Sequence, residues 1–77
     1  MQIDFEVLFR LHFRPLCLYA LHYLGDVEAA EDVVQEVLLK LFAIRDRIDG
    51  TSNPMALAQV AVRHTVLNLL RDAKRHP

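Results

Sequence analysis

Apolar residues recur at intervals of three and four along almost the whole chain, and this spacing restricts the fold more than any other feature. Such stripes are typical of helices, and they run through residues 3–24, 27–45 and 54–73. No alternating pattern typical of strands accompanies them. Because 77 residues suffice for only one core, we predict an all-α domain, a small bundle of three to four helices. Side chains expected to face inward include Phe9, Leu16, Val34, Phe42, Val62 and Leu69.

A few residues predict where the helices begin and end. Pro15 removes a backbone hydrogen bond and must break or kink the first segment, so we expect two helical pieces. Gly25 supplies the left-handed residue that commonly ends a helix, and Asp26 follows as the N-cap of the next helix. Residues 46–53 are polar and rich in turn-forming types, which predicts a loop. Asn53–Pro54 then mark the start of the last helix.

The charges are segregated along the chain, although the formal net charge is only −1. Residues 1–25 balance, residues 26–50 carry seven acids and three bases, and residues 51–77 carry four bases and one acid. An acidic middle suggests a basic partner, and a basic end suggests a polyanion. The alternative from the same pattern is that both are ordinary solvated helix faces.

Several classes of protein are excluded by what the sequence lacks. A single cysteine, Cys17, cannot build a disulfide framework, and its apolar neighbours predict a small buried side chain in a reducing compartment. The uncharged stretch 15–25 is shorter than the roughly 20 residues that span a bilayer. The sequence contains no glycine-rich phosphate loop, HExxH or CxxC motif. We therefore expect no catalytic residues, no cofactor, no metal site and no membrane association, and a cytoplasmic location.

Two helix faces carry candidate binding residues. In the second helix, Asp32, Gln35 and Glu36 are spaced to meet a basic partner helix, with Leu39 adding apolar contact. In the last helix, cations can neutralise phosphates while polar side chains meet bases or sugars. The residues of this second face are Arg63, His64, Asn68, Arg71, Lys74 and Arg75. Cations placed at a helix C-terminus for dipole reasons are the alternative.

Three sequence blocks follow one another in a characteristic order: Phe13–Ala20, then Gly25–Asp26 with Ala30–Phe42, and finally Val62–Asp72. In this order and spacing, they resemble region 2 of the extracytoplasmic-function sigma factors of the sigma-70 family. The resemblance covers nearly the whole chain. It implies that residues 1–77 form one sigma region 2 domain of bacterial transcription initiation, with the C-terminal domain that reads the −35 element absent from this chain.

The resemblance also implies a partner for each face. In this family the second-helix block binds the clamp helices of the polymerase β′ subunit, which assigns core-polymerase binding to Asp32, Gln35, Glu36 and Leu39. The loop before the last helix, and that helix, bind the promoter −10 element and capture a base of the melted non-template strand. The corresponding DNA-binding residues are Asp49, Gly50, Thr51, Ser52, Asn53, Arg63, His64, Asn68, Arg71, Lys74 and Arg75. An anti-sigma factor is a further candidate partner.

The last helix departs from the family pattern in two respects. Residues 55–60 lack the aromatic side chains that the family usually has early in this helix, and His64 stands where Asn is common. Aromatic stacking contributes about 1–3 kcal/mol per base, so its loss bears on DNA recognition. The imidazole of His64 can donate and accept one hydrogen bond each, but it cannot reproduce the paired hydrogen bonds of an amide. Both departures favour an alternative function: a helical protein–protein interaction module, a degenerate sigma-like domain that binds polymerase or an anti-sigma factor without recognising DNA.

Overall fold

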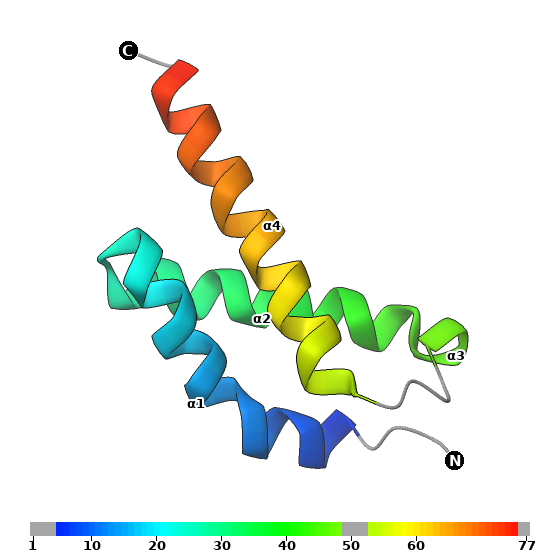
Figure 1. Ribbon diagram of the computed structural model, residues 1–77. Coiled ribbons are helices and arrows are strands. Elements are labelled where there is room, and N and C mark those ends of the chain that lie inside the picture. The colour runs from blue at the N-terminus through cyan, green and yellow to red at the C-terminus, as the bar shows by residue number, and fades with distance from the viewer. Residues whose placement is uncertain (1–4, 49–52, 76–77) are drawn as a thin grey trace.

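The computed structural model describes residues 5–48 and 53–75, and these residues contain four helices (Figure 1). They are α1 (Phe5–Leu24), α2 (Val27–Ala43), the single turn α3 (Arg45–Ile48) and α4 (Pro54–Arg75). The three long helices contact one another pairwise, and α3 contacts α2. The all-α prediction of a small helical bundle is therefore confirmed.

The junction between α1 and α2 forms as its sequence predicts. Gly25 takes a φ of 70°, and its N–H donates to the carbonyl of Leu21 at 2.8 Å. The Asp26 carboxylate then accepts from the backbone N–H groups of Glu28 at 2.9 Å and Ala29 at 3.5 Å. These bonds satisfy amide groups that have no partner inside the helix, which fixes the first residue of α2.

The prediction that Pro15 divides the first helix is wrong, because α1 is continuous from Phe5 to Leu24. Pro15 costs the carbonyl of Leu11 its hydrogen bond. Both residues are exposed, so water can solvate that carbonyl and the helix need not end. Figure 1 shows that the ribbon of α1 bends along its length, which is the usual response to an internal proline.

The segment after α2 also differs from the expected loop, because residues 45–48 form the helical turn α3. The Ile44 N–H donates to the carbonyls of Lys40 and Leu41 at 3.3 and 3.2 Å, and the Arg47 N–H donates to the carbonyl of Ile44 at 2.9 Å. One further helical turn therefore satisfies the backbone while its polar side chains stay in water. Residues 49–52 lie outside the described part of the chain.

The core lies where the three long helices meet, and most of its side chains are small. It comprises Leu16 and Ala20 of α1, Ala30, Val33, Val34, Val37, Leu38 and Leu41 of α2, and Ala58, Val62 and Val66 of α4. Small side chains allow close approach of helix axes. The inward positions predicted for Leu16, Val34 and Val62 are confirmed.

Three residues predicted to face inward are exposed instead: Phe9, Phe42 and Leu69. Leu69 is exposed because it lies in the C-terminal half of α4, which extends beyond the other helices (Figure 1). The last buried side chain of α4 is Val66, and every side chain described from residue 67 to 73 is exposed. The predicted start of α4 is confirmed, since the Asn53 side-chain oxygen accepts from the Ala56 N–H at 3.0 Å.

Candidate functional site

The acidic face of α2 is fully available to a partner. Asp32, Gln35, Glu36 and Leu39 are all exposed and share one side of the helix, opposite the buried valines. Glu36 pairs with Lys40 at 3.1 Å, and both side chains are largely in water. An exposed pair of this spacing contributes only about 0.3–0.5 kcal/mol, so a partner's cation can readily replace Lys40.

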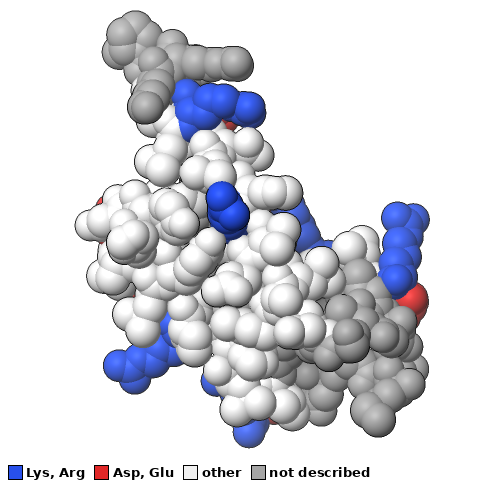
Figure 2. Space-filling view, viewed as in Figure 1, with Lys and Arg blue, Asp and Glu red and all other residues white. Residues whose placement is uncertain are grey.

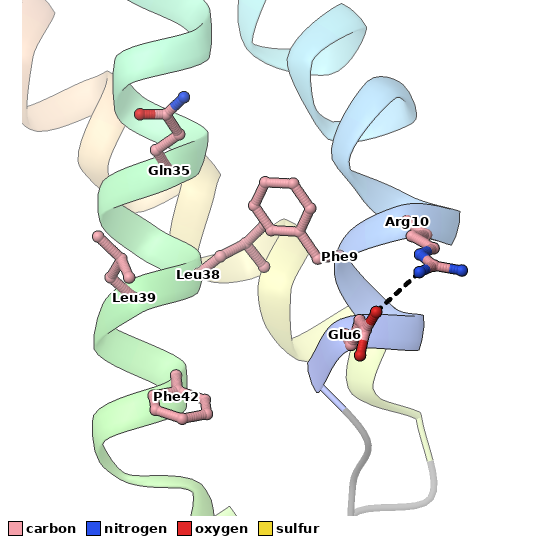
Figure 3. Close-up of a pocket in the computed structure, with 7 residues that line it drawn as sticks. All are labelled: Glu6, Phe9, Arg10, Gln35, Leu38, Leu39 and Phe42. Carbon is pink, nitrogen blue, oxygen red and sulfur yellow. Dashed lines mark hydrogen bonds and ion pairs between the residues drawn. The ribbon is translucent and has the colours of Figure 1, made fainter.

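Beside this face a groove of about 580 Å³ lies between α1 and α2 (Figure 3). Figure 3 shows the ring of Phe9 directed from α1 toward Leu38 on α2, with the ion pair of Glu6 and Arg10 along the α1 side. That pair is 2.7 Å long, so the two charges neutralise each other. The lining residues are Glu6, Phe9, Arg10, Gln35, Leu38, Leu39 and Phe42. Gln35 and Leu39 thus belong to both the predicted face and the groove.

Large apolar side chains remain uncovered in this groove. Leu39 is 69% exposed, Phe42 46% and Phe9 43%. Local contacts hold the two rings: Phe9 stacks on Phe13 with ring centres 4.7 Å apart, and the Arg45 guanidinium lies 4.2 Å from the Phe42 ring centre. Rigid, solvent-facing apolar groups gathered in one groove indicate a surface for a partner. Sequence reasoning missed Phe9 and Phe42 because their helical positions match the inward stripe.

The polar stripe of α4 is exposed as well. His64, Asn68 and Arg71 follow one another at intervals of four and three, and Arg63 lies next to His64 on the adjoining side. Lys74 and Arg75 belong to the last turn of the α4 backbone. Of the predicted loop residues, Asn53 is exposed and caps α4, whereas Asp49, Gly50, Thr51 and Ser52 lie outside the described residues.

The two candidate surfaces belong to different sides of the bundle. Because α2 and α4 bury valines against each other, their exposed residues point away from the shared core in different directions. In the view of Figure 2, where α4 crosses in front of α2, few Asp or Glu side chains are visible. The acidic face of α2 and the basic stripe of α4 can therefore engage separate partners.

Comparison with known proteins decides the family. The profile described as Sigma-70 region 2 matches residues 8–76, nearly the whole chain. The chain belongs to the sigma-70 region 2 family. No curated protein and no solved structure matches it significantly.

Sigma-70 region 2 binds core RNA polymerase and recognises the promoter −10 element in transcription initiation, and the family is not enzymatic. The predictions of a sigma region 2 domain, of its role in initiation and of a non-enzymatic protein are confirmed. No comparison assigns these activities to individual residues, so the residues of each face stay predictions.

Within residues 5–48 and 53–75, no three His, Cys, Asp or Glu side chains gather into a metal site, and no helix is long and apolar enough to cross a bilayer. Cys17 is half-buried at the edge of the core. Burial and, to a smaller extent, the negative charge of Glu31 raise the pKa of its thiol above 9.0, so the thiol is not activated as a nucleophile.

Proposed function

We propose that this chain is the region 2 domain of an extracytoplasmic-function sigma factor and that α2, together with the α1–α2 groove, binds the clamp helices of the polymerase β′ subunit. One observation carries the proposal: the exposed acidic face of α2 adjoins an apolar groove, and Gln35 and Leu39 belong to both. The sequence blocks described above support assignment to this subgroup of the family.

The chemistry of the groove defines the kind of helix that fits it. Leu39 and Phe42 offer apolar contact, while Asp32 and Glu36 place carboxylates on the neighbouring exposed surface of α2. The complementary partner is an amphipathic helix with apolar residues along one stripe and Lys or Arg beside it. Gln35 lines the groove between these two regions and can donate and accept hydrogen bonds across the interface.

We assign binding of the −10 element to α4 and to the segment that precedes it. Arg63 and Arg71 are exposed and can neutralise phosphates, as can Lys74 and Arg75 by their positions in the sequence. His64 and Asn68 carry hydrogen-bonding groups suited to bases or sugars. Residues 49–53 are the proposed segment for capturing a base of the non-template strand.

The groove also suits a regulatory partner. Its apolar side chains are uncovered in the free domain, and an anti-sigma factor that covers them would compete with polymerase for the same residues. A cytoplasmic location follows from a role in bacterial transcription.

A charge-matched pull-down with the β′ clamp helices tests the polymerase surface. The double variant Gln35→Ala/Glu36→Lys should lose retention, because it removes a polar contact and repels a basic partner helix. Asp46→Lys in α3 is the matched control, since it changes an exposed acid by the same two charges and does not line the groove. Equal retention of the double variant and the control would overturn the assignment.

A salt series with single-stranded −10 oligonucleotides tests the DNA surface. Each phosphate contact adds about 0.7 to the slope of log affinity against log salt concentration for single strands. Arg71→Ala should therefore lower that slope by roughly 0.7, whereas the charge-neutral substitution Gln59→Ala, exposed on the same helix, should leave it unchanged. An unchanged slope in Arg71→Ala would remove this residue from the DNA surface.

A further inference from the structure

An aromatic cluster lies at the C-terminal end of α1, outside both surfaces described so far. Tyr23 packs edge-on against Tyr19, with ring centres 5.4 Å apart and planes at 68°. His22 packs against Tyr23 in the same manner, with ring centres 5.3 Å apart and planes at 85°. Tyr23 is 37% exposed and His22 is exposed, whereas Tyr19 is half-buried against the core. Tyr23 is thus an orientated ring with part of its surface in water.

This cluster adjoins the basic helix. α1 and α4 are in contact, and the positive charge of Arg63 on α4 acts on the hydroxyl of Tyr19. Hydrogen bonding with Tyr23 raises the pKa of Tyr19 above 10.0, and Arg63 acts in the opposite direction. Arg63 is exposed to solvent on α4, the helix that α1 contacts.

We propose that Tyr23, held by Tyr19 and His22 on the helix that contacts α4, is a stacking site for an unpaired base of the promoter strand that α4 binds. This inference rests on the proposed DNA-binding role of α4. The exposed side chains early in α4 are Ala56, Gln59 and Val60, none of which offers a flat ring to a base. Tyr23 on the neighbouring helix α1 offers such a ring.

The arrangement suits a nucleotide because it joins a flat apolar surface to a cation. A base stacks on the Tyr23 ring, and Arg63 reaches a phosphate of the same or the next nucleotide. The edge-on packing of Tyr19 and His22 restrains the Tyr23 side chain before binding, so stacking costs little further side-chain entropy. Stacking reads no hydrogen-bond pattern, so this site adds affinity for any unpaired base at one position of the strand.

Substitutions at Tyr23 separate the ring from the hydroxyl. Tyr23→Leu should weaken binding of a labelled single-stranded −10 oligonucleotide by about five- to tenfold, the lower part of the stacking range, because only part of the ring is exposed. Tyr23→Phe keeps the ring and should bind within about twofold of the wild type. Since Tyr23→Leu removes no phosphate contact, the salt slope of its affinity should equal that of the wild type.

Abasic oligonucleotides identify the base that stacks. In a series with one abasic position each, one position should weaken binding to the wild-type chain but not to Tyr23→Leu, because the base and the ring form a single contact. Tyrosine emission reports the same event directly, since the chain has two tyrosines and no tryptophan. The intact oligonucleotide should quench this emission, and the oligonucleotide that is abasic at the stacking position should not.

Controls separate failure of this site from failure of the DNA-binding role. Leu11→Ala removes an exposed apolar side chain from the other half of α1, outside the groove, and should leave DNA affinity unchanged. If Tyr23→Leu binds like the wild type while Arg71→Ala is weaker, the stacking site is refuted and the role of α4 stands. If Leu11→Ala loses as much affinity as Tyr23→Leu, the loss is not specific and the site is refuted. If the wild type shows no salt-dependent binding, both proposals fail.

Discussion

Leu39 tests the groove more sharply than any charged residue, because its contribution can be calculated from its exposure. Complete burial of a leucine side chain contributes about 1.5–3 kcal/mol. Leu39 is 69% exposed in the free domain, so roughly two-thirds of that burial, about 1–2 kcal/mol, becomes available only when a partner covers it. Leu39→Ala should therefore weaken binding of the β′ clamp helices by about 5- to 30-fold.

The assay is a titration of labelled clamp helices followed by fluorescence anisotropy, with Leu11→Ala as the matched control. Leu11 is 63% exposed and also lies in a helix, but it does not line the groove. Alanine favours the helix at least as well as leucine does, so neither substitution should lower the free energy of unfolding by much. The reasoning is refuted if the two variants bind equally well, or if Leu39→Ala lowers the melting temperature enough to account for its weaker binding.

Three predictions concern the scaffold. Leu16→Ala should lower the free energy of unfolding by about 2–5 kcal/mol in urea titration, since Leu16 is fully buried between the helices; a loss below 1 kcal/mol would mean that the core collapses around the gap. Asp26→Ala should cost about 0.5–2 kcal/mol and Asp26→Asn less, because the amide oxygen can still cap α2; equal costs would argue against capping. Cys17 should react with iodoacetamide more slowly than a free cysteine at the same pH, because a raised pKa leaves less thiolate. Glu31→Gln should speed this reaction, and a slower reaction would contradict the charge effect.

The features of the fold that are set within a few residues could be predicted from the sequence. Gly25 ends α1 and Asp26 begins α2 because a left-handed residue and a capping carboxylate act on amide groups two or three positions away. Asn53 begins α4 for the same reason. Local hydrogen bonds of this kind do not depend on what the rest of the chain does.

Features that depend on packing or on water were not predictable in the same way. A proline forbids one hydrogen bond, but whether the helix ends there depends on whether water reaches the freed carbonyl, and at Leu11 it can. Phe42 has the correct helical phase for the core, yet 46% of its surface remains exposed. The apolar spacing of a helix predicts the direction in which a side chain points. It does not predict whether another part of the chain packs against that side chain.

The candidate site likewise has one part that the sequence could predict and another that it could not. The exposure of Asp32, Gln35 and Glu36 follows from their spacing on a helix whose other side is apolar, so the sequence could predict this face. The groove requires Phe9 of α1 to lie beside α2, and the charge of Arg63 acts on Tyr19 only because α1 contacts α4. Both depend on contacts between residues far apart in the chain, for which helical periodicity carries no information.

The separation of the two charged faces explains how one small domain with a net charge of −1 can bind DNA. The exposed acids of α2 and Arg63 and Arg71 of α4 point away from a core that both helices share, and the bundle measures 21 by 16 Å across its shorter axes. At physiological salt, exposed charges are screened over about 8 Å, which is less than either dimension. If α4 binds DNA as we propose, a phosphate at Arg71 is attracted by the nearby cations of α4 and only weakly repelled by Glu36. The number of cations on α4, not the net charge of the chain, should set the salt dependence of DNA binding.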